Sequence, residues 1–358
     1  MAGQNRSSCR VAVAILNWNG EAHLRRFLPS VVAHSSIEDL VVVIDNGSDD
    51  GSLSLLGSEF PAVEVVRLKE NLGFAGGYNE GLELLQHRLD ADWFLLLNSD
   101  VEVTQDWVDV LVETCIREGW SAAQPKIRSV EERLEFEYAG AAGGYMDRHG
   151  FMFCAGRIFD ARERDLGQYD QDRPVFWASG AALLVRAEAW REAGGLDVDF
   201  FAHMEEIDLC WRMRNRGHVV GVATGAHVFH LGGGTLAHSS PRKALFNFRN
   251  NLYLLLKNDH RRGIGGRIFF RQCLDGLAAI RFLMQGKPDF FKAVIRAHSE
   301  FRKSRATMTA KRHAEMEVCA RVESGDAGRH GVYRGSILLD YFLRGKRKWT
   351  DLPPAGFL

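Results

Sequence analysis

Three carboxylates lie close together in the segment GGLDVDFFAHMEEIDLCWRMRNRGH, which spans residues 194–218. Glu205, Glu206 and Asp208 fall in the expected first turn of a helix that follows a glycine corner. Adjacent acids repel one another, which raises the pKa of one of them and suits a general base. A helix N-terminus also favours acids, and Asp208 with Arg212 makes an i,i+4 pair, so capping explains part of the cluster. The whole cluster exceeds what capping requires and predicts a general base.

A second group of short polar side chains follows three apolar runs. VAVAIL, LVVVI and WFLLL end on Asn-Trp-Asn-Gly at 17–20, Asp-Asn-Gly-Ser at 45–48 and Asn-Ser-Asp at 98–100. The carboxyl ends of parallel strands share one edge of a sheet, so these clusters should meet in one crevice. We expect a nucleotide to bind there.

Asp45 and Asp100 are the acids of that edge. Asp45 can accept hydrogen bonds from a nucleobase or a ribose, and Asp100 can hold Mg²⁺ or Mn²⁺ against a diphosphate, because these cations prefer oxygen ligands. Either acid alone is explained as well by a helix cap or a turn. Their common placement at strand ends favours ligand binding.

The stretch NLGFAGGYN at 71–79 is a glycine-bearing loop that should open a helix. It matches neither the GxGxxG motif nor the P-loop, and no lysine follows it. We interpret it as a helix N-terminus whose N–H groups face the nucleotide sugar, with Asn71, Gly76 and Asn79 on the donor side. A plain tight turn is the alternative.

His230 ends the strand-like stretch VVGVATGAHVFH and precedes three glycines, which allow close approach of a ligand. It is a candidate for a second metal ligand or for a hydrogen-bond donor to a diphosphate. A lone histidine is commonly a packing or surface residue, and His227 is the competing candidate nearby.

Hydrophobic periodicity supplies the scaffold for these residues. Strand and helix patterns alternate over the first 120 residues and predict a doubly wound α/β fold with a mostly parallel sheet. From 129 to 173 the periodicity fades, and the aromatic content favours long ordered loops over the crevice. We expect strands at 11–16, 40–44, 63–68, 93–97 and 181–185, and helices at 21–34, after 49–52, after 71–79 and at 107–118.

The composition fits one large or two modest globular domains, since a quarter of the 358 residues are charged and the net charge is −1. The six cysteines are scattered with no CxxC pair, which favours reduced thiols over disulfides or a cysteine metal site. No stretch reaches the length of a membrane span, and the apolar run after the polar first ten residues is too short for a signal peptide. We therefore expect a cytoplasmic protein.

The C-terminal part is more basic than the rest. Residues 257–312 hold 14 Lys or Arg and 4 Asp or Glu. This pattern fits a basic amphipathic helix on an anionic membrane, and equally an ordinary packed helix with a solvated basic face. Nucleic acid is not an expected partner, because no binding motif accompanies the charges. Apolar and basic residues alternate here at helical spacing: Phe269, Cys273, Leu277, Ile280 and Met284 between Arg267, Arg271 and Arg281.

Seven motifs follow one another between residues 10 and 256: VAILNWNG, VVVIDNGSDDGS, ENLGFAGGYNEGL, LLLNSDVEV, WASGAALLVR, GGLDVDFFAHMEEIDLCWR and HVFHLGGG. In this order they resemble the inverting family 2 glycosyltransferases with a GT-A fold, in particular the rhamnosyltransferase-like branch that builds cell-surface polysaccharides. The resemblance implies a catalytic domain at 1–256. A basic, largely helical extension at 257–358 would then serve membrane or acceptor binding.

The resemblance also implies roles for single residues. Glu206 matches the catalytic base with Glu205 beside it, Asp100 matches the last acid of the metal-binding DxD motif, and His230 matches a histidine that helps to hold the metal and diphosphate. Asn98 stands where the family often has Asp, which removes one charge from the metal site. Donor-binding residues would be Asn17, Asn19, Asp45, Asn71, Gly76, Asn79, Asn98 and Ser99, and acceptor-side residues Trp177, Gly180 and Asp208.

The implied reaction moves rhamnose or a related hexose from a UDP- or dTDP-linked donor to a saccharide, on a polyprenyl diphosphate carrier at the inner face of the membrane. Glu206 would deprotonate the acceptor hydroxyl, and Mg²⁺ or Mn²⁺ would stabilise the leaving diphosphate, with inversion at the anomeric carbon. A sugar nucleotidyltransferase would carry a basic glycine-rich loop after its first strand, where this chain has Asn-Trp-Asn-Gly. A saccharide-binding or scaffold protein derived from a transferase is the non-enzymatic alternative.

Overall fold

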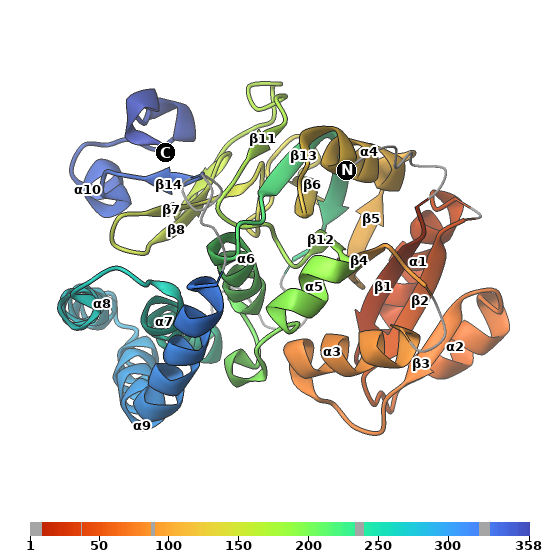
Figure 1. The fold of residues 1–358 in the computed structure, drawn as a ribbon, viewed down its shortest axis with the longest axis horizontal. Helices are drawn as coiled ribbons and strands as arrows, with labels where there is room; N and C mark the ends of the chain where they lie inside the picture. The colour runs from red at the N-terminus through yellow and green to blue at the C-terminus, as the bar shows by residue number, and fades with distance from the viewer. Residues whose placement is uncertain (1–8, 37, 87–89, 233–239, 322–329) are drawn as a thin grey trace.

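The computed structural model describes residues 9–36, 38–86, 90–232, 240–321 and 330–358. A nine-stranded sheet crosses the molecule, and a second sheet of five short strands lies beside it (Figure 1). Helices of the C-terminal third gather at the opposite end from the N-terminal strands (Figure 1). The α/β fold class predicted from the periodicity is confirmed.

The N-terminal half alternates strands and helices, as the hydrophobic runs predict. Its strands are long apolar segments bounded by turn residues, and its helices carry one apolar face each. The elements are β1 (Val11–Asn17), α1 (Glu21–Ala33), β2 (Leu40–Asp45), α2 (Ser52–Glu59), β3 (Glu64–Arg67), α3 (Gly73–Gln86), β4 (Trp93–Asn98), β5 (Val101–Val103) and α4 (Trp107–Glu118).

The parallel part of the large sheet has the strand order β4-β1-β2-β3. Its register places Asn17 opposite Asp45 on β2, and Leu16 opposite Asn98 on β4. The three polar clusters predicted at strand ends therefore share one edge. Helices α1, α2 and α4 cover one face of this sheet, whereas α3 packs on the other.

The other half of the sheet is mixed, because β12 runs antiparallel between β4 and β6. The β13 strand returns parallel to β6 and also pairs antiparallel with β5. Parallel pairing thus holds only in part of the sheet. The elements are β6 (Ala122–Ser129), β11 (Arg173–Pro174), β12 (Ala182–Arg186), α5 (Ala187–Ala193), the 3-10 turn η2 (Val198–Phe200), α6 (Glu205–Asn215) and β13 (Val220–His230).

The prediction of long loops from 129 to 173 is wrong. This region forms a second sheet with the order β10-β9-β8-β7-β14, together with β11 of the large sheet. Its strands have two to four residues, too short for a period-2 pattern to appear in the sequence. They are β7 (Gly144–Asp147), β8 (Met152–Cys154), β9 (Arg157–Ile158), β10 (Ala161–Arg162) and β14 (Val332–Tyr333).

The last strand, β14, comes from the C-terminal end of the chain and pairs in parallel with β7. The backbone N–H of Ile337 donates to the carboxylate of Asp147 at 3.0 Å, across 190 residues of sequence. Phe357 packs against Tyr145 and Tyr333, with ring centroids 5.4 and 5.1 Å apart. The small sheet is thus completed by residues far from its hairpins.

Of the C-terminal helices, α7 packs against α6, and α8 and α9 pack against α7 and against each other. The domain boundary predicted after residue 256 falls inside α7. This helix contacts α6 on one side of the boundary and α8 and α9 on the other. The boundary therefore stays a prediction. In the part of the chain that the structure describes, no helix is both long and apolar enough to cross a membrane. These elements are α7 (Pro241–Asn258), α8 (Ile264–Met284), α9 (Pro288–Cys319), α10 (Ile337–Phe342) and the 3-10 turns η4 (Trp349–Asp351) and η5 (Pro354–Gly356).

Candidate active site

The ends of β1 and β2 form the nucleoside side of the candidate site. Asp45 is buried, and its carboxylate accepts hydrogen bonds from Asn17 Nδ2 at 3.2 Å and from the backbone N–H of Ser48 at 3.1 Å. Asn17 Oδ1 is buried and has no hydrogen-bond partner among the described residues. Asn19 lies in the left-handed region (φ 49°), and its backbone N–H donates to Ser48 Oγ at 3.0 Å. The two loops are therefore bound to one another.

A pocket of about 310 Å³ opens beside these loops, at the ends of β2 and β3. Two of its lining side chains are cations, so it offers positive charge next to the buried carboxylate of Asp45. This surface suits an anionic nucleotide. The lining residues are Gly47, Ser48, Arg67, Leu68 and Lys69.

The interpretation of 71–79 as a loop needs correction, because α3 already begins at Gly73. Gly76 and Asn79 therefore lie within the helix. Asn71 Oδ1 accepts from the Gly73 N–H at 2.8 Å and caps the helix start. The Asn79 amide pairs with the backbone of Leu196, through bonds of 2.8 and 2.9 Å, and so ties α3 to the segment before η2.

Sequence reasoning missed Asn46, which organises the same edge. Its side chain donates to Asn71 Oδ1 at 3.1 Å and to the Gly73 carbonyl at 3.0 Å, and accepts from the Leu72 N–H at 3.0 Å. It thereby joins the end of β2 to the start of α3. Its position directly after Asp45 was the available signal.

The metal candidates meet because β13 pairs with β5, which places His230 opposite Val101. His230 Nε2 lies 3.1 Å from Asp100 Oδ1 and 3.4 Å from Asn98 Nδ2. His230 Nδ1 faces Glu137 Oε2 at 3.3 Å. Burial alone would lower the pKa of His230, but the two carboxylates outweigh it and raise that pKa to about 10.

Asp100 and His230 fit a divalent cation. Two adjacent ligands of one Mg²⁺ or Mn²⁺, each at about 2.1 Å, lie about 3 Å apart, which is the separation of these two atoms. Glu137, which sequence reasoning missed, would hold the imidazole as carboxylates do behind metal-binding histidines. The described residues contain no group of three or more His, Cys, Asp or Glu side chains arranged for a metal. Of the glycines after His230, Gly233 and Gly234 lie outside the described residues.

The acids of α6 follow a strained loop. Phe201, His203 and Met204 have φ values of 62°, 68° and 71°, which lie in the left-handed region of the backbone. Residues other than glycine rarely adopt this conformation. Such strain persists only where the surroundings impose it, and it is frequent at functional sites. Here Asn250 of α7 supplies the restraint, since its Nδ2 lies 2.7–3.0 Å from the carbonyl oxygens of Phe200, Ala202 and His203.

Glu205 and Glu206 differ in exposure. Glu205 is 4% exposed, and its Oε2 has no hydrogen-bond partner in the described part of the chain. Burial, and next the charge of Glu206, raise the pKa of Glu205 well above its ordinary value. Burial raises the pKa of Glu206, which is partly exposed, to about 7. Glu206 is therefore suited to exchange a proton near neutral pH, whereas Glu205 holds its proton more tightly than an ordinary glutamic acid.

Gly180 connects the acids to the strand edge. A Cβ atom at this position would lie 3.5 Å from Cβ of Glu206 and 3.3 Å from the ring of Phe74 in α3. The next residue, Ala181, accepts a hydrogen bond from the backbone N–H of Asn98 at 3.0 Å. Glu206 and Asn98, the neighbour of the metal candidate His230, thus contact the same short segment.

Trp177 and Asp208 are engaged inside the protein. The Trp177 ring N–H donates to the Tyr145 carbonyl at 3.2 Å, and the ring is buried. Asp208 is fully buried between Arg212 and Lys257, at 2.8 and 2.9 Å. Burial raises the pKa of Asp208, but these two cations outweigh it and lower that pKa overall. We therefore do not assign either residue to acceptor binding.

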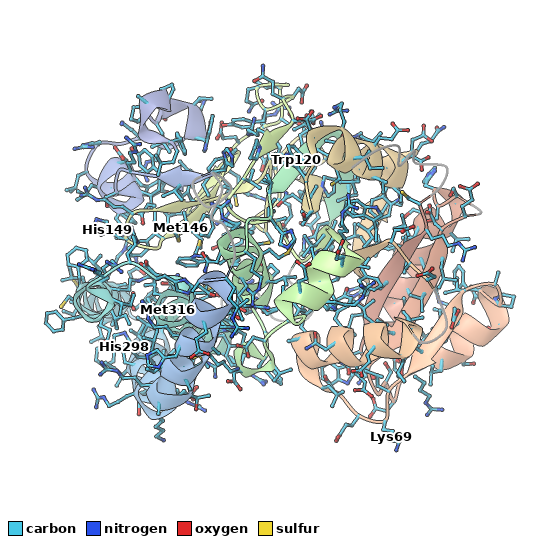
Figure 2. The ribbon with its side chains drawn as sticks, viewed as in Figure 1. Lys69, Trp120, Met146, His149, His298 and Met316 are labelled. Atoms are coloured by element: carbon cyan, nitrogen blue, oxygen red, sulfur yellow. The ribbon has the colours of Figure 1, made fainter. Side chains whose placement is uncertain are left out.

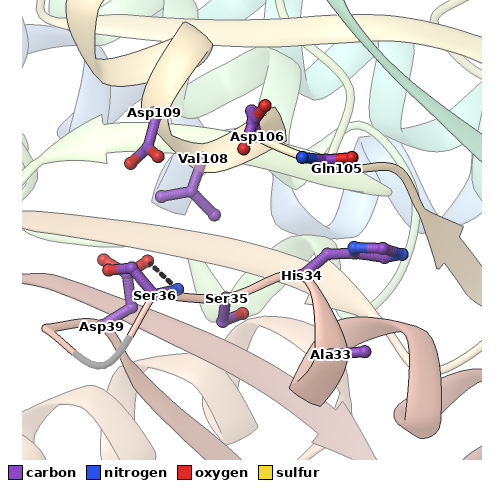
Figure 3. A pocket seen from close by; sticks show the side chains of 9 residues that line it. All are labelled: Ala33, His34, Ser35, Ser36, Asp39, Gln105, Asp106, Val108 and Asp109. Atoms are coloured by element: carbon purple, nitrogen blue, oxygen red, sulfur yellow. Dashed lines mark hydrogen bonds between the residues drawn. The ribbon is translucent and has the colours of Figure 1, made fainter.

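A separate pocket of about 250 Å³ lies between the end of α1 and the start of α4 (Figure 3). Figure 3 shows Asp39, Asp106 and Asp109 around it, with Asp39 accepting from the Ser36 N–H at 3.1 Å. None of the residues predicted for the site lines this pocket. It is distinct from the strand edge.

The class of the protein follows from fold and site together. Residues 12–153 match the family model described as "Glycosyl transferase family 2". The structure resembles S. aureus TarS 1-349 in complex with UDP-GlcNAc (TM-score 0.52, 14% identity, 87% of this chain and 89% of that chain). It also resembles GalNAc-T7 with UDP, GalNAc and Mn²⁺ (TM-score 0.52, 17% identity, 70% and 48%). Over residues 12–153 the chain is therefore similar to the family 2 glycosyltransferases, and it has a GT-A fold.

Two curated relatives narrow the branch. The chain is 28% identical to the N-acetylglucosaminyl-diphospho-decaprenol L-rhamnosyltransferase of Mycobacterium tuberculosis, over 69% of this chain and 84% of that protein. It is 22% identical to the low-salt glycan biosynthesis hexosyltransferase Agl10 of Haloferax volcanii, over 62% and 66%. The rhamnosyltransferase-like resemblance stated from the motifs is confirmed.

Proposed function

We propose that the protein is an inverting, metal-dependent hexosyltransferase of cell-surface polysaccharide synthesis. It transfers rhamnose or a related hexose from a UDP- or dTDP-linked donor to a saccharide on a polyprenyl diphosphate. The single observation that carries the proposal is that Glu206 and Asn98, which lies beside the Asp100–His230 pair, both contact the segment at 180–181. The mycobacterial relative, named for transfer to a diphospholipid-linked sugar, supports the acceptor class.

The donor binds along the strand edge in this proposal. Asp45, held by Asn17, accepts hydrogen bonds from the nucleoside, beside the pocket that Arg67 and Lys69 line. Asp100 and His230 would hold Mg²⁺ or Mn²⁺, which supplies positive charge to the departing diphosphate. His230 must lose its proton to serve as a ligand, so metal binding releases a proton.

Glu206 is the general base. Its carboxylate removes the proton of the acceptor hydroxyl as that oxygen attacks the anomeric carbon from the face opposite the nucleotide. Glu205 keeps its proton beside it in this proposal, because burial and the charge of Glu206 raise the pKa of Glu205. A single displacement of this kind inverts the anomeric configuration.

The experiment combines binding and turnover. Thermal unfolding is recorded with UDP, dTDP, GDP and their sugars, each with Mn²⁺ or with EDTA, because a bound ligand raises the melting temperature. The stabilising donor is then incubated with a short-chain polyprenyl diphosphate N-acetylglucosamine, and the anomeric configuration of the product is read by NMR. Transfer with inversion that EDTA abolishes is the expected result.

The alternatives predict different results. Binding of saccharide acceptor without turnover of any donor would favour a saccharide-binding protein derived from a transferase. Formation of a nucleotide sugar from a nucleoside triphosphate would favour a sugar nucleotidyltransferase. A product with retained configuration would contradict the assignment of Glu206 as a base that activates the acceptor directly.

A further inference from the structure

Helix α8 presents its apolar side chains to the outside. Phe269, Leu277, Ile280 and Met284 are 69%, 64%, 53% and 83% exposed, and Cys273 between them is exposed as well. Their spacing of three to four residues forms one continuous stripe along the helix. In a helix that packs on a protein with one side in water, the apolar stripe faces the protein and the polar side chains face the water.

The buried side of α8 carries an ion pair together with two apolar residues, Ile268 and Ala279. Arg271 and Asp275 are 6% and 2% exposed and pair at 2.9 Å. Arg271 also donates to the Gly150 carbonyl at 3.3 Å, and His298 of α9 lies 3.3 Å from Asp275. Figure 2 shows His149 and His298 on the two sides of this helix. Polar contacts thus fix α8 to the protein, and its apolar stripe stays uncovered by the described residues.

The stripe continues onto α10. Leu339, Phe342 and Leu343 are 43%, 46% and 78% exposed, and the Arg281 guanidinium of α8 lies 5.2 Å from the centroid of the Phe342 ring. We call these residues and the α8 stripe the apolar face. A contiguous exposed apolar surface on two neighbouring helices marks an interaction site.

The two segments that carry the apolar face are basic. Residues 261–287 contain six Arg or Lys and one acid, and residues 339–348 contain four Arg or Lys and one acid. Both acids, Asp275 and Asp340, are buried and paired. Arg281, Lys287 and Arg347 are exposed. The exposed charge of both segments is therefore entirely basic.

We propose that the apolar face docks on an anionic lipid membrane. Apolar side chains in the acyl boundary with a basic rim at the headgroups are the arrangement by which interfacial helices bind such surfaces. Charge complementarity favours this occupant over a second copy of the chain, since two basic rims would repel each other. The inference stands independently of the proposed function.

The test uses the full chain and sedimentation with vesicles of phosphatidylglycerol and phosphatidylcholine, or of phosphatidylcholine alone. The wild type should bind the anionic vesicles, more weakly in 0.5 M salt, and bind neutral vesicles poorly. Leu277→Glu with Ile280→Glu should reduce the partition coefficient by about tenfold or more, because apolar burial is lost and two negative charges are added.

Helix α9 offers a matched control. Its Ile295 is 53% exposed, as Ile280 of α8 is, but it lies outside the apolar face. Ile295→Glu should bind vesicles like the wild type. Unchanged binding of the double variant, or equal binding of the wild type to neutral and anionic vesicles, would overturn the proposal. A wild-type dimer in sedimentation velocity that the double variant dissociates would overturn it too, in favour of a protein interface. Circular dichroism checks that both variants are folded, and donor-induced thermal shifts report the nucleotide site separately.

Discussion

The donor edge and the acid-bearing corner of the site are held by different means. At the donor edge, Asp45 is restrained by Asn17 on the adjacent strand and by Ser48 in its own turn. At the corner, the segment before Glu206 is restrained by Asn250, which lies about fifty residues further along the chain. The proposed donor site is thus held within the sheet, whereas the placement of the proposed base depends on a helix that packs against it from a later part of the chain. Substitutions in the two regions should therefore affect different quantities, donor binding at the donor edge and kcat at the corner.

The largest effect is expected from Glu206→Gln. Loss of a general base lowers kcat by about 10²–10⁴. The dissociation constant of the donor should stay within about threefold of the wild type, because Asp45 and the strand edge are untouched. Single-turnover kinetics and donor titration measure the two quantities.

Glu205→Gln is the matched control, because a protonated glutamic acid and glutamine have similar shape and charge. We expect Glu205→Gln to lower kcat by less than about tenfold. A larger loss for Glu205→Gln than for Glu206→Gln would exchange the roles of the two acids.

The pH dependence sharpens the same comparison. With the pKa of Glu206 near 7, kcat should fall about tenfold per pH unit below that value and level off above it. Because this pKa is raised from 4.5, the folded state holds the proton more tightly than the unfolded chain. The contribution of Glu206 to stability is therefore lost as the pH rises from about 4.5 to about 7. Denaturant unfolding of the wild type and Glu206→Gln across this range measures it, and parallel curves would contradict the raised pKa.

Asn250→Ala tests the restraint from outside. It removes a donor that three carbonyl oxygens share, although Arg249 still donates to the carbonyl of Phe200, and this costs about 1–3 kcal/mol of stability. We expect kcat to fall between about tenfold and hundredfold through misplacement of the base, with donor binding retained.

Asn251→Ala is its neighbour control. Asn251 is also buried, but donates to the Gly150 carbonyl at 3.1 Å, away from the acids. It should lose stability while keeping kcat near the wild-type value. Equal loss of kcat in both variants would mean that α7 acts only through general stability.

The smallest effect is expected from Asp45→Asn. Removing one charged hydrogen-bond acceptor should raise the donor KM about five- to tenfold and leave kcat unchanged. Asp49→Asn, an exposed acid of the same loop, should change neither value by more than about twofold. A fall in kcat for Asp45→Asn would mean that the donor edge also positions the reacting atoms.

The sequence predicted where the acids lie better than it predicted the contacts that hold them. Asp45 and Asp100 end long apolar strands, so periodicity alone brought them to one edge. Asn79 was misread, because its amide contacts Leu196, 117 residues away, and nothing local indicates that contact. Asn46, Glu137 and Asn250 were missed for the same reason, since their partners are distant in sequence. The small sheet was missed because its strands are too short to show a pattern.

Because β14 completes the small sheet, this sheet forms only after the ribosome has made the C-terminal end of the chain. The partners Asp147 and Ile337 are separated by 190 residues. At about 5–20 residues per second, the ribosome needs roughly 10–40 seconds to add them. Until then β7 has an open edge, and Tyr145 lacks the ring of Phe357. The nascent chain therefore exposes a strand that can pair wrongly, and we expect it to need chaperone protection in that interval.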